Sequence, residues 1–167
     1  PWGPAIRLLL LTGCRENEIC GAKWEWYSAT DQTLLIPPEH YKNKRDFLVT
    51  LPVAAVTELE ALPRWNGGDF ILTTTNGVKP IAGIARKTLD RLHSEAESIL
   101  GRPIKRFALH DFRRTVRTHL SRLGVNEVVA ELVLGHSLKG LQARYNVYGY
   151  ADEKRAALEE WAAALRA

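Results

Sequence analysis

The chain of 167 residues contains no methionine, only two cysteines and no long apolar run. Two cysteines, Cys14 and Cys20, are too few for a disulfide framework or a cysteine-based zinc site, so we interpret both as small buried residues in a reducing compartment. No apolar stretch is long enough to span a bilayer and no signal peptide is recognisable, so we expect a cytoplasmic protein without membrane contact.

Sequence patterns typical of metal and nucleotide sites are also missing. No acidic cluster has the spacing of a magnesium site, and no glycine-rich phosphate loop of the Walker type is present. We therefore expect no metal and no nucleotide cofactor. Residue 1 is proline, and since methionine is missing throughout, we expect a domain excised from a longer protein whose N-terminal neighbour is absent.

The residues that are present suit one globular domain. Hydrophobic residues make up 46% and charged residues 25%, which are ordinary values, and the length is sufficient for a full hydrophobic core. The formal net charge is +4, and basic residues dominate the stretch from 102 to 122, where Asp111 is the single acid. A solvated helix face explains that stretch as well as a polyanionic partner does.

Hydrophobic periodicity and turn residues predict a mainly helical domain with one small antiparallel sheet, an α+β arrangement. Two short β-like runs, residues 33–37 and 47–51, flank a polar connection that holds Lys42 and Lys44, and this pattern indicates a hairpin. Residues 70–72 read as a further brief strand. Helices are predicted over residues 2–11, from after Gly13 to about 24, 52–62, 81–100, 110–123, 126–135, from 138 through Tyr145, and 151–167.

Three short strings hold most of the residues whose chemistry suits a phosphodiester. Residues 12–18 read Thr-Gly-Cys-Arg-Glu-Asn-Glu, residues 109–115 read Leu-His-Asp-Phe-Arg-Arg-Thr, and residues 134–136 read Leu-Gly-His, with a tyrosine nine residues further on. Arginine, lysine and histidine can hold and protonate a phosphate group, and a tyrosine can attack it. The candidate residues are Arg15, Lys42, His110, Arg113, His136 and Tyr145.

The two arginines occupy positions that favour an anion. Arg15 lies at a predicted helix start, where free N–H groups and the positive end of the helix dipole already favour negative charge. Arg113 lies only about 60° from the centre of an apolar helix face, so its guanidinium is partly desolvated and needs an anion. Glu18 can orient Arg15. The structural alternatives are an internal ion pair of Arg113 with Glu18 or Asp111, and a surface ion pair between Arg15 and Glu18.

Three further candidates each have an ordinary structural explanation when they are taken alone. Lys42 can be an exposed loop lysine, His136 can cap a helix or lie in the core, and Tyr145 can be a half-buried structural tyrosine. The combination of all the strings in one chain and in one order is what makes the pattern specific.

The order and spacing of the strings resemble the tyrosine recombinases, also called the phage integrase family, over nearly the whole chain. Lys44 is an alternative to Lys42 as the hairpin lysine, and Tyr148 and Tyr150 are alternatives to Tyr145. The following strand favours Lys42, and the nine-residue spacing from the second histidine favours Tyr145. The resemblance implies that Arg15 and Arg113 are the catalytic arginines, Glu18 the acidic support of the first, Lys42 the hairpin lysine, His110 and His136 the two histidines, and Tyr145 the nucleophile.

By this resemblance, residues 1–167 form a single domain with the family's catalytic fold and carry out metal-independent, site-specific DNA recombination. Tyr145 would attack the scissile phosphate, leaving a 3′-phosphotyrosyl link and a free 5′-hydroxyl, and strand exchange would follow. The expected partner is double-stranded DNA. Two alternatives remain, a type IB topoisomerase-like enzyme that relaxes DNA and a non-catalytic DNA-binding module. Further DNA contacts are expected from Lys44, Arg45, Arg106, Arg114 and Arg117.

The resemblance also implies self-association, as a tetramer on DNA in the full protein. The predicted terminal helix, residues 151–167, has an apolar stripe formed by Leu158, Trp161 and Leu165. This stripe either packs on a neighbouring protomer, so that the helix is exchanged, or packs within its own chain.

Overall fold

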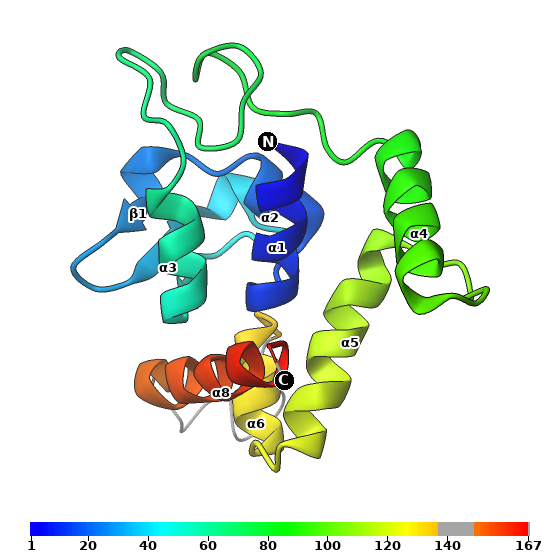
Figure 1. Cartoon of the computed structure of the whole chain (residues 1–167). Coiled ribbons are helices and arrows are strands. Elements are labelled where there is room, and N and C mark those ends of the chain that lie inside the picture. The colour runs from blue at the N-terminus through cyan, green and yellow to red at the C-terminus, as the bar shows by residue number, and fades with distance from the viewer. Residues whose placement is uncertain (137–148, 167) are drawn as a thin grey trace.

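The computed structural model of the chain describes residues 1–136 and 149–166 (Figure 1). These residues are mainly α-helical with one small antiparallel sheet, which confirms the predicted α+β class. The α-helices are α1 (Trp2–Thr12), α2 (Glu16–Cys20), α3 (Val53–Glu60), α4 (Arg86–Leu100), α5 (Leu109–Arg122), α6 (Glu127–Val133) and α8 (Ala151–Ala164). The strands are β1 (Tyr27–Ser28), β2 (Thr33–Ile36) and β3 (Phe47–Thr50), and the 3-10 turns are η1 (Trp24–Trp26) and η2 (Pro38–His40).

The predicted hairpin is present between β2 and β3. The two strands pair antiparallel, with Leu34 opposite Val49 and Leu35 opposite Leu48. The first pair is buried and the second is exposed, so alternation along the strands turns one face of the sheet toward the core. β1 extends the sheet in the order β1-β2-β3. Sequence analysis did not predict this strand, because two residues are too short for a recognisable alternation.

Two apolar clusters form the core. The first surrounds α1, α2, α3 and the sheet, and includes Leu8, Ile19 and Ile36. The second joins α5, α6 and α8 through residues such as Leu120 and Leu158. Because α1 contacts α3 of the first cluster and also α5 and α8 of the second, it connects the two clusters (Figure 1). The two clusters therefore meet at the C-terminal end of α1, where residues 12–18, the first of the three candidate strings, begin.

Two predicted helices have different limits in the structure. The second helix was expected to reach about residue 24, but α2 ends at Cys20, and Trp24 donates its backbone N–H to the Asp69 carbonyl. The helix expected from residue 81 begins at Arg86. Ile84 is buried in the first cluster, and its backbone N–H donates to Glu16 Oε1 at 2.6 Å, which holds this segment in a non-helical path. The brief strand expected at residues 70–72 is only an isolated bridge between residues 23 and 70.

Helix α8 packs on α1, α3, α5, α6 and β3 of the same chain. Leu158 and Trp161 are buried, and Trp161 Nε1 donates to the Leu10 carbonyl at 2.7 Å, whereas Leu165 is exposed. The exchange of this helix between protomers stays a prediction. The helix expected from residue 138, with Tyr145, lies outside the described residues.

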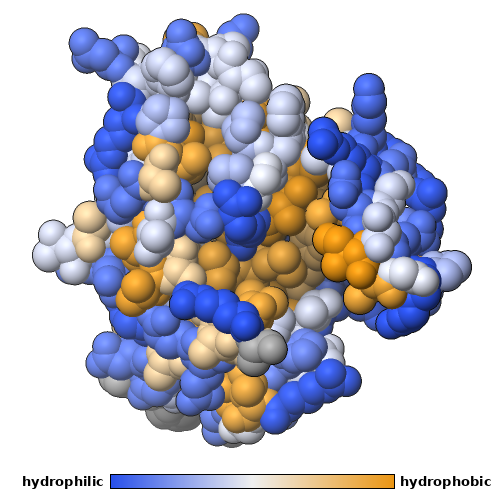
Figure 2. Space-filling view, in the orientation of Figure 1, coloured by the Kyte–Doolittle hydropathy of each residue, from blue (hydrophilic) through white to orange (hydrophobic). Residues whose placement is uncertain are grey.

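The face of the molecule shown in Figure 2 is largely hydrophilic at its edges, and apolar residues gather in the hollow between α1 and α4. Within residues 1–136 and 149–166, no helix is both long and apolar enough to cross a membrane.

Candidate active site

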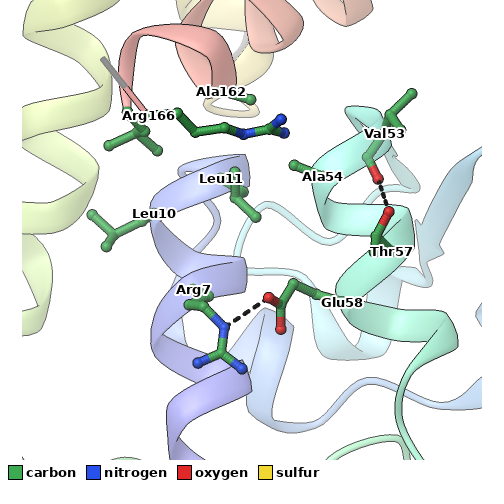
Figure 3. Close-up of a pocket in the computed structure, with 10 residues that line it drawn as sticks. Arg7, Leu10, Leu11, Val53, Ala54, Thr57, Glu58, Ala162 and Arg166 are labelled. Atoms are coloured by element: carbon green, nitrogen blue, oxygen red, sulfur yellow. Dashed lines mark hydrogen bonds and ion pairs between the residues drawn. The ribbon is translucent and has the colours of Figure 1, made fainter.

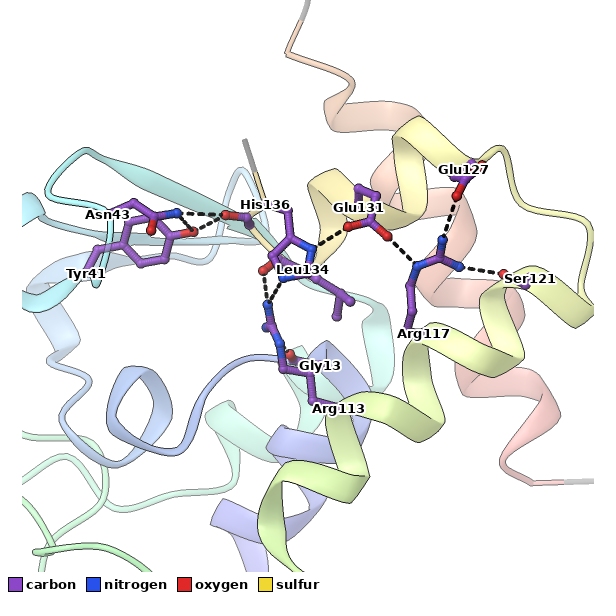
Figure 4. A network of polar contacts seen from close by, with 11 residues as sticks. Gly13, Tyr41, Asn43, Arg113, Arg117, Ser121, Glu127, Glu131, Leu134 and His136 are labelled. Carbon is purple, nitrogen blue, oxygen red and sulfur yellow. Dashed lines mark hydrogen bonds and ion pairs between the residues drawn. The ribbon is translucent and has the colours of Figure 1, made fainter. Parts of the chain in front are cut away.

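Arg113 lies at the junction of the two apolar clusters and is only 6% exposed. Helix α5 directs its guanidinium toward the end of α1 and the end of α6. Arg113 Nη1 donates to the Gly13 carbonyl at 2.6 Å, and Nη2 donates to the Leu134 carbonyl (Figure 4). These two contacts are to carbonyl oxygens rather than to the carboxylates considered as alternatives. Among residues 1–136 and 149–166, Arg113 has no ion pair, so its positive charge is oriented there without being neutralised.

Arg15 is the N-terminal cap of the short helix α2, and its position depends on Glu18. The backbone N–H of Arg15 donates to Glu18 Oε2 at 2.7 Å, and Nη1 donates to Glu18 Oε1 at 2.7 Å. Glu18 is 2% exposed, so this is a partly buried, two-point contact rather than a surface ion pair. The predicted orientation of Arg15 by Glu18 is therefore present.

The two arginines influence each other electrostatically. Burial, followed by repulsion from Arg15, lowers the pKa of Arg113. Burial also acts to lower the pKa of Arg15, but the hydrogen bond that Arg15 donates to Glu18 and the neighbouring Tyr41 outweigh it, and the net shift is upward. Arginine remains charged in either case. Two cations held near each other favour an anion between them.

A pocket of about 260 Å³ brings three of the predicted residues together. Arg15, His110 and Arg113 all line it, although Arg15 and His110 are far apart in the sequence. His110 is in the first turn of α5 and is exposed. Cys14 also lines the pocket, but burial raises the pKa of its thiol to about 12, so it stays protonated and is a poor nucleophile.

A second pocket, of about 290 Å³, places the hairpin lysines next to Arg15. Lys42 and Lys44 both line it, together with Glu18 and Tyr41. Arg15 borders both pockets, so the hairpin loop and the N-terminal end of α5 face the same guanidinium. The geometry places both lysines here and leaves the choice between them open.

His136 follows α6 and contacts Arg113 directly. The distance from Arg113 Nη2 to His136 Nε2 is 3.2 Å. The other ring nitrogen, Nδ1, contacts Glu131 Oε2, and Glu131 Oε1 accepts from Arg117 Nε at 2.6 Å (Figure 4). Burial raises the pKa of Glu131, but the hydrogen bonds from His136 and Arg117 outweigh it and hold the pKa below its ordinary value. Glu131 is therefore ionised near neutral pH.

Sequence analysis missed both Glu131 and Tyr41. Tyr41 is 1% exposed, stacks on Phe47 and donates its hydroxyl to the Gly135 carbonyl, which ties the hairpin to the turn that precedes His136. Its ring also lies 5.5 Å from the Arg15 guanidinium carbon. Their positions in the sequence were the only signals that could have indicated a role in the site. Tyr41 directly precedes the hairpin lysine, and Glu131 precedes His136 by five residues.

The arrangement as a whole is a cationic, partly desolvated site of the kind that binds a phosphate group. In the part of the chain that the structure describes, no group of three histidine, cysteine or acidic side chains is placed to hold a metal ion.

Comparison with known proteins gives the family of the chain. The sequence profile of the phage integrase family matches residues 4–150. The chain belongs to the phage integrase family, the tyrosine recombinases. It is 30% identical over 164 residues to the prophage integrase IntZ of Escherichia coli strain K12, and this alignment covers 96% of the chain and 39% of that relative.

Solved structures with the same fold are also integrases and recombinases. The integrase of mycobacterium phage Brujita matches 95% of the chain and 50% of its own length, with a TM-score of 0.65 and 19% identity. The Tn1549 transposon integrase in complex with transposon right end DNA matches 95% of the chain and 58% of its own length, with a TM-score of 0.60 and 18% identity. The chain thus spans between 39% and 58% of the length of these proteins.

In this phage integrase chain, the residues expected to contact DNA differ in their surroundings. Lys44 and Arg45 are exposed in the hairpin loop. Arg106 pairs with Asp90 at 2.5 Å and Arg114 with Asp111 at 3.4 Å, both at the surface. Arg117 is held by acidic residues of α6.

A further pocket, of about 550 Å³, lies between α1, α3 and the end of α8 (Figure 3). Its lining is mostly apolar, with Arg7 paired to Glu58 at 2.8 Å on one side. None of the predicted site residues lines this pocket, so it is separate from the cationic site.

Proposed function

We propose that the chain is the catalytic part of a site-specific DNA recombinase in which Tyr145 is the nucleophile. The observation that carries the proposal is the convergence of Arg15, His110 and Arg113 with the hairpin lysines around adjoining pockets. His136 contacts Arg113 directly. Family membership supports DNA cleavage and rejoining in general. Relatives of the same fold are described in complex with DNA, namely the Tn1549 integrase and the XerH recombinase bound to its difH substrate, and this supports DNA as the partner.

In the proposed reaction, the Tyr145 hydroxyl oxygen attacks the scissile phosphorus and its proton passes to a histidine of the site, His110 or His136. The bond from phosphorus to the 5′-oxygen breaks, leaving a 3′-phosphotyrosyl link, and Lys42 gives a proton to the departing 5′-oxygen. Arg15 and Arg113 stabilise the charge that develops on the non-bridging oxygens. Attack by the 5′-hydroxyl of a second strand reverses the step and completes strand exchange.

The histidines complete the proposed site. His110 at the start of α5 donates to a non-bridging oxygen, and His136 lies beside Arg113, with its Nε2 3.2 Å from Arg113 Nη2. A free tyrosine has a pKa of about 10, so the surrounding cations must favour its ionised form. Self-association on DNA, cytoplasmic location and the absence of a metal or cofactor requirement belong to the same proposal.

Covalent trapping tests the proposal. The chain, in the form that its gene encodes, is mixed with nicked DNA that carries a candidate attachment site, denatured in SDS and analysed for a protein–DNA adduct. We expect an adduct whose modified peptide contains Tyr145. Tyr145→Phe should abolish it, and the matched control Tyr148→Phe should retain it.

Two results would overturn the proposal in different directions. Measurable DNA binding without any adduct would indicate a non-catalytic DNA-binding module. An adduct accompanied by relaxation of supercoiled DNA, but without joining of strands from two sites, would indicate a topoisomerase-like enzyme.

A further inference from the structure

The ring of His136 is held from both sides, and the partners determine where its proton lies. Arg113 approaches Nε2 at 3.2 Å. A guanidinium can only donate hydrogen bonds, so Nε2 must accept and cannot carry a hydrogen in this arrangement. The proton of the neutral ring is therefore on Nδ1, where it is donated to Glu131 Oε2.

Glu131 is itself fixed by a second arginine. Its Oε1 accepts from Arg117 Nε at 2.6 Å, while the remaining nitrogens of Arg117 contact Ser121 and, at 3.5 Å, Glu127 (Figure 4). Among the residues that the structure describes, the charges in contact with His136 are Arg113 from α5 and Glu131 from α6, with Arg117 behind the carboxylate. This chain of contacts runs from the surface of α5 to the buried guanidinium of Arg113.

We propose that Glu131 is a positioning residue, which, held by Arg117, orients His136 so that Nε2 faces the phosphate site beside Arg113. When Nε2 gives up its contact with Arg113 and takes a second proton, either from the nucleophile or from solvent, the Glu131 carboxylate stabilises the imidazolium that results. Arg117 acts only through Glu131. The catalytic part of this inference rests on the proposed function, whereas the position of the proton does not.

The first test is a spectroscopic measurement on the DNA-free protein. Nitrogen-15 NMR of the His136 ring at about pH 8.5, well above the usual imidazole pKa, identifies the protonated nitrogen. We expect the proton on Nδ1. Glu131→Ala removes the acceptor of the Nδ1 proton and leaves only the weaker 3.2 Å contact of Arg113 to select the tautomer, so the Nε2-protonated fraction should rise. Glu127→Ala, on the same helix and with the same charge change, should leave the Nδ1 form unchanged.

The second test removes the charge of Glu131 and keeps the shape of its side chain. Glu131→Gln leaves one acceptor oxygen for two donors, His136 Nδ1 and Arg117 Nε, so it should weaken the preference for the Nδ1 form and slow covalent adduct formation about tenfold or more. Because glutamine has nearly the same shape, this variant also serves if Glu131→Ala does not fold. Adduct formation at the wild-type rate in Glu131→Gln would overturn the inferred stabilisation of the imidazolium.

The outcomes distinguish this inference from the proposed function. A wild-type ring protonated on Nε2, or on both nitrogens, overturns the inference even if the protein forms its adduct. A ring protonated on Nδ1 and sensitive to Glu131, in a protein that binds DNA but forms no adduct, supports the position of Glu131 while the proposed function fails.

Discussion

At the scale of single residues, Gly135 and Tyr41 depend on each other. Gly135 has φ +68°, and a Cβ built there meets the Tyr41 hydroxyl and lies 2.8 Å from two ring atoms of Phe47. Gly124 has a similar φ of +78°, but nothing lies within 4 Å of its added Cβ. A residue with a Cβ would therefore strain the backbone at either position, but it would clash with neighbouring side chains only at Gly135.

This difference predicts how two alanine variants behave. Gly124→Ala should lower the free energy of unfolding by about 1–2 kcal/mol from backbone strain alone. Gly135→Ala should lower it by a further 1–3 kcal/mol or so, because overpacking adds to the same strain. Urea unfolding followed by tryptophan fluorescence measures both. Equal losses in the two variants would show that the turn before His136 relaxes away from Tyr41 without cost.

The contrast between Arg113 and its partners shows what residue-level sequence analysis can reach. Its position next to the apolar face of α5 predicted a desolvated guanidinium, and the residue is indeed buried. Its hydrogen-bond acceptors, the carbonyls of Gly13 and Leu134, are ordinary backbone groups 100 and 21 residues away, so no side-chain pattern marks them. Carboxylates are the partners that a sequence suggests, because it names the side chains that can accept a hydrogen bond. It does not reveal which backbone carbonyl the fold brings close.

At the scale of secondary-structure elements, α8 is held by polar side chains as well as by its apolar stripe. Arg155 donates to the carbonyls of Asp31 at 2.7 Å, Leu51 at 3.1 Å and Gln32 at 3.2 Å, which joins the helix to the loop before β2 and the end of β3. Lys154, which is buried, donates to the Leu48 carbonyl at 3.1 Å. These contacts fix the helix that follows the segment with Tyr145.

The Arg155 contacts predict a loss of stability when the side chain is removed. Arg155→Ala leaves three backbone carbonyls without their charged donor and should lower the free energy of unfolding by about 1.5–3 kcal/mol. Arg166→Ala removes the same charge at an exposed position beyond the end of α8 and should change it by about 0.5 kcal/mol or less. Thermal or urea unfolding of the two variants checks this. Similar small effects in both would show that the apolar stripe alone holds α8.

Element limits were predictable where local signals agree with the fold. Asn126 was expected to cap α6, and its side chain does accept from the Val128 N–H at 2.9 Å. The start of α4 was not predictable, because the apolar residues at 81 and 84 continue a helical pattern but are buried in the first cluster as part of an irregular segment. Tertiary burial and the Glu16 contact decide that boundary, and neither is visible locally.

At the scale of the whole molecule, the candidate site lies where two separately packed groups of helices meet. Arg113 hydrogen-bonds to the end of α1 in one group and to the end of α6 in the other. Tyr41 makes a second link, from the hairpin to the turn after α6. Because the same residues hold the two groups together and form the site, we expect substitutions there to change stability and DNA cleavage together.

The net charge of +4 and the basic loop of the hairpin predict salt-dependent DNA binding, in which each phosphate contact contributes about one to the slope of log affinity against log salt. Lys44→Ala and Arg45→Ala, in the exposed loop, should each weaken binding and reduce the slope by about one. Arg117→Ala should change the slope much less, since Glu131, Ser121 and Glu127 already occupy its nitrogens.

Fluorescence anisotropy over a range of salt concentrations measures these slopes. Arg64→Ala is the control for the loss of one positive charge, because the Arg64 guanidinium stacks over Trp24 at 4.2 Å and pairs with Glu60. A reduction for Arg117→Ala as large as that for Lys44→Ala would show that DNA displaces the acidic residues from Arg117. In that case Arg117 would contact DNA, as the sequence alone predicted, and its contact with Glu131 would belong only to the DNA-free protein.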